Sequence, residues 1–483
     1  MPLKVRRETL PQRPPLINNL NIPMLPPPFV HQMQQLLGHE YPDFAAALQE
    51  PPPVSIRYST GRKQQTANGK QQTATLSPQP SAPVPWHPQG RYLSERPVFT
   101  LDPALHAGAY YVQEAASMFL REALRQSLDF SNPLKVLDLC AAPGGKSTLL
   151  ADMLPLDSLL VANEVIKTRI GPLRENLERW GCPNVAVTSA EAEAFGAMQG
   201  WFDVVVCDAP CSGEGLFRKD PDAVREWSPE QVEVCAVRQR RILAAAVEAL
   251  APGGVLAYST CTYNRTENEG NAAWLAAEFG LVPLRLEMPA DWGITVGEQG
   301  GCRFFPHRTR GEGFFIAVFR KKSGTSPRHA APAQFALLKP LAKNALPEAA
   351  RWLRPDVEAR FFQTPSSEVL ALPAALESDF LFLDKYLKAK WFGVNIGEFK
   401  GKDFIPSHAL ALSRWVSPTL PGLALSREQA LLFLKKETFE IPPDTPLGWT
   451  LAQFEGLNLG WVKLLPNRMN NYLPPERRIR MAV

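Results

Sequence analysis

The sequence predicts an α/β fold in which a Rossmann-like, mainly parallel sheet is covered by helices on both faces. Between residues 136 and 259, short apolar, β-favouring runs alternate with longer segments of helical periodicity, the order of elements that builds such a sheet. The first run is followed by a turn containing Pro143, Gly144 and Gly145, and a helical pattern begins directly after it. The second run ends in an acidic residue, Glu164. This arrangement is typical of a sheet that binds a nucleoside-containing cofactor.

The N-terminal part of the chain divides into a tail and a small module. Residues 1–28 are rich in proline and basic residues and have no periodic apolar face, so we expect a flexible tail. Residues 29–48 carry apolar side chains at helical spacing and begin a module that we expect to end at residue 95. We expect the main domain to cover residues 96–320.

Helices of the main domain are predicted by the spacing of their apolar side chains. Four side chains between residues 108 and 126 fall on one helical face, which predicts a helix packed on the sheet. They are Val112, Ala116, Phe119 and Ala123. A second helix is expected over residues 168–181, where Gly181 is a common C-terminal stop. A third is expected over residues 232–250, and residues 311–320 should form part of a closing hairpin.

The turn and the acidic residue together indicate which cofactor the sheet binds. The turn reads C-A-A-P-G-G-K-S, which is neither the G-x-G-x-x-G of dinucleotide-binding folds nor the G-x-x-x-x-G-K-[ST] of phosphate loops. S-adenosyl-L-methionine has a ribose and an amino-acid tail but no phosphate, so a short glycine turn and an acid at the ribose hydroxyls suffice. We therefore expect this cofactor, with Glu164 at its ribose. On spacing alone, a purely structural turn is the alternative.

Two cysteines follow the last two parallel strands. The run DVVVCD at residues 203–208 leads into Cys211, and the run GVLAYS at residues 254–259 leads into Cys261. Because ligands of open α/β sheets lie beyond the carboxyl ends of the strands, neighbouring strands would direct both cysteines into the crevice beside the turn. Burial as a small apolar side chain is the usual alternative for cysteine, and four others fit it well. These are Cys182, Cys207, Cys235 and Cys302.

These motifs resemble the successive motifs of the Sun (NOL/NOP/Sun) family of RNA cytosine-5 methyltransferases. The resemblance is carried by VLDLCAAPGGK, DAPCSGEG and YSTCT, and by RKDPDA followed by WSPE, and it covers residues 55–320. It implies a class I S-adenosylmethionine-dependent methyltransferase fold. The end of the chain, with LGWVK and PNR, is similar to the RNA-binding region of the RsmF-type bacterial enzymes of this family, which act on 16S ribosomal RNA. That similarity implies a C-terminal α+β region that is PUA-like towards its end.

The resemblance also implies roles for single residues. It implies that Cys261 is the attacking thiol and that Cys211 assists loss of the C5 proton and release of the RNA. In DNA cytosine methyltransferases the nucleophile follows a proline, which would nominate Cys211 instead. A thiolate that adds to C6 of cytosine makes C5 nucleophilic, which is covalent catalysis. The family's SIR signature implies that Arg57 lies near the RNA backbone and that residues 29–95 form an N-terminal RNA-binding module, although Ser59 departs from the asparagine common in the family.

The cofactor and the target base are expected to meet beside the turn. The residues expected to wrap the methionine tail are Cys140, Ala141, Ala142, Pro143, Gly144, Gly145 and Lys146. We expect Asp208 to contact the cytosine N3/N4 edge or the cofactor amino group, with Lys146 in the same crevice; a structural pair between the two is the alternative. Related enzymes bind the adenine amino group through an aspartate after the third strand, where this chain has Glu191. An exposed loop acid is the alternative there.

Composition sets limits on class and location. At 483 residues the chain is long enough for about two to four domains. Its 52 basic and 48 acidic residues nearly balance, so any nucleic-acid surface must be local. The seven cysteines include no C-x-x-C pair and no signal peptide is recognisable, so we expect no metal site, no disulfide scaffold and a cytoplasmic protein. No run of about 18 uncharged apolar residues exists, so we expect no membrane span.

The last third of the chain is expected to bind RNA. Residues 321–334 are basic and patternless, which predicts a linker before a C-terminal RNA-binding region at residues 335–483. Residues 386–402 interleave basic and aromatic side chains that can bind phosphates and bases; a solvated lysine face over a small core is the alternative. The final segment adds local positive charge, which favours RNA. Its basic residues are Lys463, Arg468, Arg477, Arg478 and Arg480.

Two functions of different classes are consistent with these patterns. We expect a monomeric methyltransferase that forms 5-methylcytosine in 16S ribosomal RNA, either naked or within the small ribosomal subunit. The alternative is a catalytically silent RNA-binding assembly factor with the same fold, against which the intact Cys211, Cys261 and glycine turn argue. A nicotinamide-dependent enzyme is disfavoured because G-x-G-x-x-G is missing.

Overall fold

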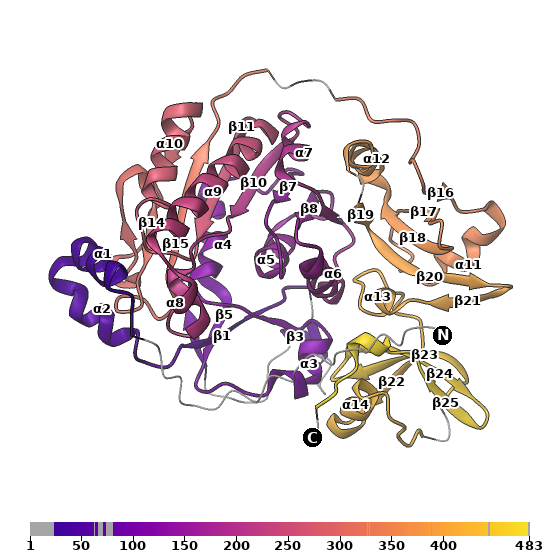
Figure 1. Cartoon of the computed structure of the whole chain (residues 1–483). Coiled ribbons are helices and arrows are strands. Elements are labelled where there is room, and N and C mark those ends of the chain that lie inside the picture. The colour runs from indigo at the N-terminus through magenta and orange to yellow at the C-terminus, as the bar shows by residue number, and fades with distance from the viewer. Residues whose placement is uncertain are drawn as a thin grey trace, which may run out of the picture.

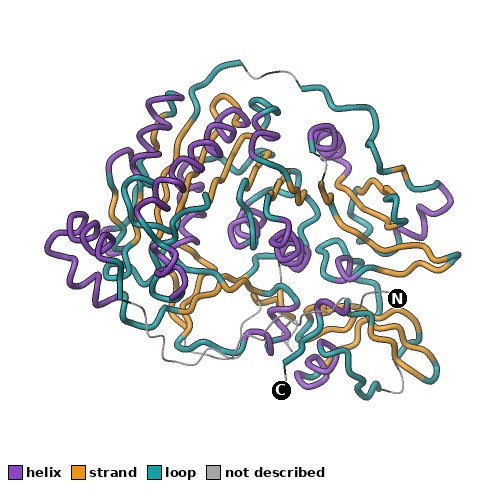
Figure 2. Tube along the Cα trace, in the orientation of Figure 1, coloured by secondary structure: helices purple, strands orange, loops and turns teal. Residues whose placement is uncertain are grey.

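The computed structural model describes residues 24–61, 63–65, 71–73, 81–325, 327, 329–387, 389–442 and 445–481. Residues 1–23, most of the expected N-terminal tail, lie outside the described residues. In Figure 1 the chain forms a central body of sheet and helices, with the first two helices at one side and the C-terminal region at the other. Figure 2 shows that helices and strands alternate in the central body, whereas strands dominate the C-terminal region.

The described part of the N-terminal module contains three α-helices, a four-stranded sheet and a separate pair of strands. Its elements are α1 (Pro27–Leu37), α2 (Tyr41–Ala47), β1 (Val54–Tyr58), β2 (Lys63–Gln65), β3 (Gln71–Thr73), β4 (Ser81–Val84), β5 (His87–Leu93), α3 (Pro103–His106) and β6 (Tyr110–Val112). The sheet has the order β4-β5-β1-β6, and β2 pairs separately with β3. Helices α1 and α2 are not isolated, because Phe29 and Phe44 share a core with Phe217, Trp227 and Tyr263 of the main domain.

The central sheet is a set of parallel strands extended by antiparallel strands at both edges. Its elements are β7 (Lys135–Asp138), β8 (Leu159–Asn163), β9 (Val185–Ser189), β10 (Phe202–Asp208), β11 (Leu250–Thr260), β12 (Val282–Leu284), β13 (Thr295–Val296), β14 (Cys302–Phe304), β15 (Phe314–Arg320) and β19 (Ala389–Phe392). The order is β13-β14-β15-β11-β10-β7-β8-β9-β19, with β12 paired to β15. Strands β7 to β11 pair in parallel, whereas β15 and β19 run antiparallel to β11 and β9. The predicted Rossmann-like sheet is therefore confirmed.

Helices cover both faces of this sheet. They are α4 (Leu120–Ser127), α5 (Gly145–Met153), α6 (Lys167–Trp180), α7 (Ala192–Gly196), α9 (Pro229–Ala249) and α10 (Glu269–Phe279). Helix α8 (Pro221–Glu226) packs instead in the core shared with α1 and α2. Successive strand residues belong to opposite layers, as the pleat of a strand requires. Leu137 packs in the layer with α7, α9 and α10, and its neighbour Val136 packs in the layer with α4, α5 and α6. With both faces covered, the loops at the carboxyl ends of the strands are left to build a site.

The predicted helix boundaries are right in one case and wrong in another. Helix α6 ends where predicted, and Gly181 caps it with a positive φ of 76°. The helix predicted over residues 108–126 is wrong at its start, because Val112 lies on β6 and regular helix begins only at Leu120, after the 3₁₀ turn Ala116–Phe119. Strand β6 pairs with β1, which is distant in sequence, and this pairing decides its conformation.

The C-terminal region contains two further sheets. Its elements are β16 (Lys339–Pro340), α11 (Leu346–Ala350), β17 (Ala359–Gln363), β18 (Glu368–Pro373), α12 (Glu377–Tyr386), β20 (Val394–Lys400), β21 (Asp403–Pro406), α13 (His408–Ala411), β22 (Gly422–Leu425), α14 (Arg427–Leu434), β23 (Gly448–Phe454), β24 (Leu457–Leu465) and β25 (Arg468–Asn471). The sheets have the orders β16-β17-β18-β20-β21 and β22-β23-β24-β25. Side chains of the second sheet share one core with α3 and β6 of the N-terminal module. The end of the chain is thus packed against its beginning.

Strand β19 comes from the C-terminal region and joins the edge of the central sheet. It pairs with β9 with Phe392 opposite Ala186, and Phe392 is buried in the core of that sheet. The side chain of Lys390 is largely buried, with Nζ 2.7 Å from Oδ1 of Asp384. The interpretation of residues 386–402 as an RNA-contacting segment is therefore wrong for Lys390 and Phe392, which fasten the C-terminal region to the sheet. Within the described ranges, the helices are too short or too polar to span a lipid bilayer.

Candidate active site

Two cysteines meet at the carboxyl ends of β10 and β11. These strands are adjacent and parallel, with Asp208 opposite Ser259, so the loops that follow them begin side by side. The Sγ atoms of Cys211 and Cys261 lie 3.2 Å apart, and both residues are half-buried. The structure therefore contains the convergence of thiols that adjacent strands predict.

Cys211 is held as a protonated thiol in this pair. Its hydrogen bond with Cys261, and then its burial, raise the pKa of the Cys211 thiol well above the usual range. The backbone N–H of Cys261 also donates to the Cys211 sulfur at 3.4 Å. A protonated Cys211 can donate its S–H to the sulfur of Cys261, which favours negative charge on that sulfur. The raised pKa therefore keeps the proton on Cys211.

The glycine turn lies at the end of the neighbouring strand, β7. Gly144 has a φ of 113°, a conformation that other residues rarely adopt, and it precedes the first turn of α5. Ser147 Oγ donates to Oδ2 of Asp138 at 2.6 Å. Burial raises the pKa of Asp138 to about 7, although the Ser147 hydrogen bond opposes that shift. Oδ1 of Asp138 is buried and, among the described residues, has no hydrogen-bond partner, so an acceptor is available beside the turn for a donor of a bound molecule.

A buried lysine connects the turn with the cysteine loops. Lys146 Nζ lies 2.7 Å from Oδ2 of Asp208, and Ser259 Oγ donates to Oδ1 of Asp208 at 2.7 Å. Burial acts to lower the pKa of Lys146, but attraction to Asp208, the hydrogen bond between them and attraction to Asp138 and Cys261 outweigh it, so the pKa is raised. The structural pair weighed as an alternative is present. The Asp208 side chain is still 34% exposed, so a further donor can reach it.

The two remaining predicted cofactor residues lie farther along the same edge. Glu164 follows β8 and is almost fully buried, accepting from the N–H of Ile166 at 2.8 Å and pairing with Arg169 at 3.3 Å. Glu191 precedes α7, and its side chain is 64% exposed, with Arg241 at 3.6 Å. The structure brings Cys211, Cys261, Lys146 and Asp208 together, whereas contacts of Glu164 and Glu191 with a cofactor stay predictions.

The residues at this edge fit S-adenosyl-L-methionine better than a nucleotide. Carboxylates rather than basic side chains follow β8 and β10, namely Glu164 and Asp208, and carboxylates suit ribose hydroxyls and an amino group. The unpartnered buried oxygen of Asp138 is a further acceptor. Such a set of acceptors offers little to a phosphate, which requires donors or cations.

Arg57 is buried beneath the turn. Its guanidinium donates to Gln113 Oε1 and Thr148 Oγ1, both at 2.7 Å, and pairs with Asp152 at 3.1 Å. It also donates to the carbonyl oxygen of Gly145 at 3.3 Å. The side chain is fully buried, so the expectation that Arg57 contacts the RNA backbone is wrong. Instead, Arg57 ties β1 of the N-terminal module to α5.

Two buried glutamates between the cysteine loops were missed from sequence. Glu214 lies three residues after Cys211, and Glu267 lies six residues after Cys261; both are completely buried. Each accepts several hydrogen bonds from the loops. A partial signal was available, since Glu214 lies within DAPCSGEG, but the donors around it come from segments that only the fold brings near.

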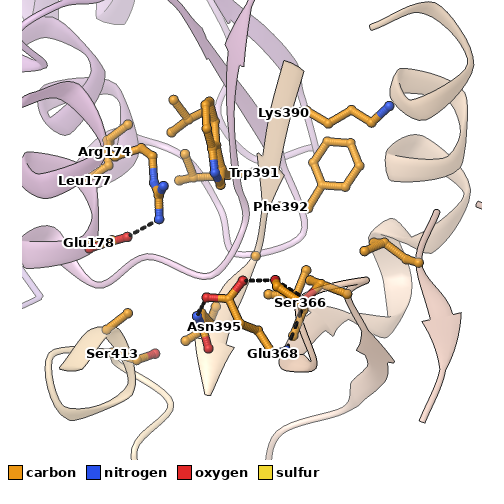
Figure 3. A pocket seen from close by; sticks show the side chains of 18 of the residues that line it. Arg174, Leu177, Glu178, Ser366, Glu368, Lys390, Trp391, Phe392, Asn395 and Ser413 are labelled. Carbon is orange, nitrogen blue, oxygen red and sulfur yellow. Dashed lines mark hydrogen bonds and ion pairs between the residues drawn. The ribbon is translucent and has the colours of Figure 1, made fainter. Parts of the chain in front are cut away.

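A separate cavity of about 310 Å³ lies between α6 and the C-terminal region. Figure 3 shows Trp391 pointing into it beside Arg174 and Glu178 of α6, with Glu368 hydrogen-bonded to Asn395 nearby. Cζ of Arg174 lies 4.8 Å from the ring centre of Trp391, and Arg174 pairs with Glu178 at 3.2 Å. These polar groups are already paired, and neither Cys211 nor Cys261 lines the cavity. The cavity therefore belongs to the junction made by β19 and not to the candidate active site.

Family models match three parts of the chain. Residues 25–115 match the N-terminal domain of 16S rRNA methyltransferase RsmF, and residues 125–320 match the model of 16S rRNA methyltransferase RsmB/F. Residues 421–479 match the methyltransferase RsmF PUA domain. The last match covers the sheet formed by β22 to β25 and confirms the predicted PUA-like end.

Whole-chain comparisons agree with these matches. The chain is 33% identical over 475 residues to ribosomal RNA small subunit methyltransferase F of Cronobacter sakazakii, covering 94% of this chain and 96% of the relative. It is 32% identical over 477 residues to the protein of the same name from Escherichia coli O9:H4, covering 93% and 96%. The crystal structure of a methyltransferase homolog protein from Pyrococcus horikoshii is similar with a TM-score of 0.51 and 29% identity, covering 61% of this chain and 94% of that one. The resemblance predicted from the motifs is confirmed, and the chain belongs to the ribosomal RNA small subunit methyltransferase F family.

Proposed function

We propose that the protein forms 5-methylcytosine in 16S ribosomal RNA, with S-adenosyl-L-methionine as methyl donor and a covalent cysteine adduct as intermediate. The observation that carries this proposal is the approach of Cys211 and Cys261 to 3.2 Å at the strand ends beside the glycine turn. Methylation of small-subunit ribosomal RNA is the activity named for the family, and a thiol that can add to C6 is the chemistry that activates carbon 5 of cytosine.

The first step belongs to Cys261. Carbon 5 of cytosine is a weak nucleophile, so the Cys261 thiolate adds to C6, and the electron pair displaced from the C5–C6 bond makes C5 nucleophilic. Cys211 supports that thiolate by keeping its own proton, because its pKa is raised by the hydrogen bond with Cys261 and by burial. The cofactor, held by the residues named below, would supply a sulfonium-bound methyl group; the new C5–methyl bond would form as the sulfur–methyl bond breaks and its electron pair stays on sulfur, leaving a neutral thioether.

Completion of the reaction requires that the proton on C5 is removed and that the bond between C6 and the Cys261 sulfur breaks. Loss of the C5 proton to a base returns an electron pair to the ring and expels the Cys261 sulfur from C6. We assign assistance in this step to Cys211, whose sulfur is in contact with that of Cys261. The Asp208 carboxylate, fixed by Lys146 and Ser259, can accept a hydrogen bond from the cytosine amino group or the cofactor.

The cofactor is assigned to the turn and the acids along the same edge. The residues that would hold it are Cys140, Ala141, Ala142, Pro143, Gly144, Gly145, Lys146, Glu164, Glu191 and Asp208. The left-handed Gly144 and the unpartnered oxygen of Asp138 support this assignment. Its chemistry there is to supply the sulfonium-bound methyl group.

We further infer that residues 335–483 contribute to RNA binding. We also infer that the protein acts as a monomer in the cytoplasm, with ribosomal RNA as its substrate. The exposed Arg468, Arg478 and Arg480 support a contact with phosphates near the end of the chain. Arg477 is less available, because its guanidinium pairs with Glu178 of α6. A base inside the duplex cannot reach two thiols at strand ends, so a loop or an opened helix end is the expected target.

The proposal is tested by direct transfer. Purified protein is incubated with methyl-labelled S-adenosylmethionine and either 16S RNA or small ribosomal subunits from cells that lack the gene, and the RNA is digested to nucleosides. Label in 5-methylcytosine is the expected result. Label in another nucleoside would overturn the cytosine-5 assignment, and tight RNA binding without label would favour the silent assembly factor.

A further inference from the structure

Glu214 lies where the loop after β10, which carries Cys211, contacts the loop after β11, which carries Cys261. It opens the 3₁₀ turn η4 (Glu214–Leu216), three residues after Cys211, and is completely buried. Its Oε2 accepts from the backbone N–H groups of Tyr263 at 2.7 Å and Asn264 at 2.8 Å, which lie two and three residues after Cys261. One side chain from the first loop therefore fixes the backbone of the second, within a few residues of both thiols.

The backbones of the two loops are also in direct contact at the next residue, Gly215. The N–H of Gly215 donates to the carbonyl oxygen of Cys261 at 2.8 Å. A Cβ at Gly215 would lie 2.6 Å from the carbonyl oxygen of Gly313 and 2.8 Å from that of Cys261, so nothing larger than glycine fits there. Close approach at Gly215 and the carboxylate at Glu214 together limit how far the loops can separate or slide.

Glu267 makes further hydrogen bonds between the same two loops. It accepts from the N–H of Ser212 at 3.1 Å and from Gln239 Nε2 at 2.6 Å. Asn264 Nδ2 lies 2.7 Å from Oε1 of Glu267 and 3.2 Å from Oε1 of Glu214, and so bridges the two carboxylates. The loops are thus held by a connected buried network rather than by one contact.

The N-terminal module reaches this network through α1. Oε1 of Glu214 accepts from Gln32 Nε2 of α1 and from Trp227 Nε1, both at 3.1 Å. The Phe29 ring of the same helix lies 4.9 Å from Phe217 and 6.4 Å from Tyr263, measured between ring centres. Helix α1 therefore contacts the segments that follow both cysteines.

A carboxylate suits this position in a way that an amide does not. Glutamate only accepts, and both of its oxygens here face N–H groups. With glutamine at this position, an amide NH₂ would face either the backbone donors at Oε2 or the side-chain donors at Oε1. Either orientation leaves buried donors unpaired, although the shape is unchanged.

We propose that Glu214 is a positioning residue for methyl transfer, which holds Cys261 in register with Cys211, and that α1 belongs to the same framework through Gln32. The proposal deepens the function proposed above and rests on it for the identity of the reaction. Its mechanical content, the relative placement of two sulfur atoms, can be measured without any methyl transfer.

The kinetic test uses the full-length chain with Glu214→Gln and Glu214→Ala. A displacement of reacting groups by about 1 Å costs about 100-fold in rate, so we expect kcat to fall about 100-fold in Glu214→Ala and about 10-fold in Glu214→Gln. KM for RNA and cofactor affinity should change less than about threefold, because neither ligand is expected to touch Glu214. An unchanged kcat, or a loss confined to KM, would overturn the proposal.

The geometric test uses the disulfide-forming reagent diamide as a ruler. Two thiols give up two hydrogen atoms to diamide and join as a disulfide, so the rate of forming the Cys211–Cys261 crosslink, followed by peptide mass spectrometry, reports their separation. We expect this crosslink to form at least about tenfold more slowly in Glu214→Ala than in the unsubstituted protein. An equal crosslinking rate would refute the positioning role even if the protein proved to methylate a different base.

A matched control separates positioning from general stability. Asp384→Asn also removes a buried, hydrogen-bonded carboxylate, but one that pairs with Lys390 in the C-terminal region. It should lower the melting temperature without slowing the crosslink or lowering kcat; equal slowing in both variants would count against Glu214. If Glu214→Ala does not fold, Gln32→Ala removes one donor, and a threefold to tenfold slower crosslink, about 0.7 to 1.4 kcal/mol, is expected. An unchanged crosslink in Gln32→Ala would remove α1 from the framework.

Discussion

Sγ of Cys211 and Sγ of Cys261 are 3.2 Å apart although the residues are separated by 50 positions in sequence. The contact arises because β10 and β11 are neighbours in the sheet and their loops begin in register. The hydrogen bond with Cys261 and burial raise the pKa of the Cys211 thiol well above its usual range, so Cys211 keeps its proton in this contact.

Cys261→Ala should abolish methyl transfer and leave cofactor binding intact. Without the sulfur that adds to C6, the rate should fall by at least about 1,000-fold, whereas calorimetric cofactor affinity should change less than about twofold. Cys302→Ala is a matched control, because Cys302 is buried on β14 and its pKa is raised to about 12 by burial. Substantial activity in Cys261→Ala would defeat the assignment of the nucleophile.

Cys211→Ala should trap the enzyme on its RNA. If Cys211 assists the release step, its loss lets Cys261 attack and leaves the adduct unresolved, so a protein–RNA band resistant to denaturant should accumulate in an SDS gel. The double variant Cys211→Ala/Cys261→Ala should show no such band. Absence of the adduct in the single variant would place the role of Cys211 before or outside the release step.

Asp138→Asn should remove one component of the pH dependence of stability. The pKa of Asp138 is raised from 3.8 to about 7 by burial, so between those values the folded chain holds a proton that the unfolded chain has lost. Its contribution to the free energy of unfolding therefore decreases as pH rises from about 4 to about 7 and stays low above that. Urea unfolding at about pH 5 and about pH 8 should show a larger loss in the unsubstituted protein than in the variant. Parallel losses would contradict the buried, protonated state.

Arg57→Ala should destabilise the chain and weaken cofactor binding. Asp152 keeps its ion pair with Arg414 at 2.9 Å, but Gln113 and Thr148 would lose a buried donor, which costs roughly 1–3 kcal/mol. The turn would also lose the bond to the Gly145 carbonyl, so cofactor affinity should fall. The exposed pair of Arg225 and Asp222 gives the control, since Arg225→Ala should change the free energy of unfolding by less than about 0.5 kcal/mol. Equal effects of the two substitutions in urea titrations would show that Arg57 is not a structural tie.

Neutralising Arg468, Arg478 and Arg480 together should weaken RNA binding and its dependence on salt. Three lost phosphate contacts lower the slope of log affinity against log salt by about 2 on single-stranded RNA. A triple alanine variant of other exposed basic residues, Arg225, Arg285 and Lys322, should leave the slope unchanged. Equal slopes in the two triple variants, measured by filter binding, would exclude the three tail arginines from the RNA surface.

The sequence predicted the elements whose signals are local. Alternating apolar runs and Gly181 located the parallel strands and the end of α6, and the order of the strands implied that Cys211 and Cys261 converge. Non-local pairing was not predictable in this way. Val112 suits a helical face as well as a strand, and only its pairing with β1 decides between them.

The roles of charged side chains were least predictable where the fold buries a residue that would otherwise be expected to bind a ligand. Arg57 and Lys390 resemble phosphate-binding residues in sequence, yet the fold pairs them with Asp152 and Asp384 away from solvent. Glu214 shows the opposite case, a residue inside a recognised motif whose importance depends on donors from α1 and from the loop after β11. The partners of Arg57 and Glu214 are distant in sequence, so no local pattern records them, whereas Asp384 is only six residues from Lys390 and its role depends on their shared burial.

The pairing of β19 with β9 has a consequence for biosynthesis. Translation delivers β9 long before β19, so the nascent catalytic sheet leaves the ribosome with an open edge that could pair with other polypeptides. The chain closes that edge itself once Phe392 has emerged. Premature termination after Cys261 but before β19 would therefore yield an aggregation-prone fragment, even though every predicted catalytic residue had already been made.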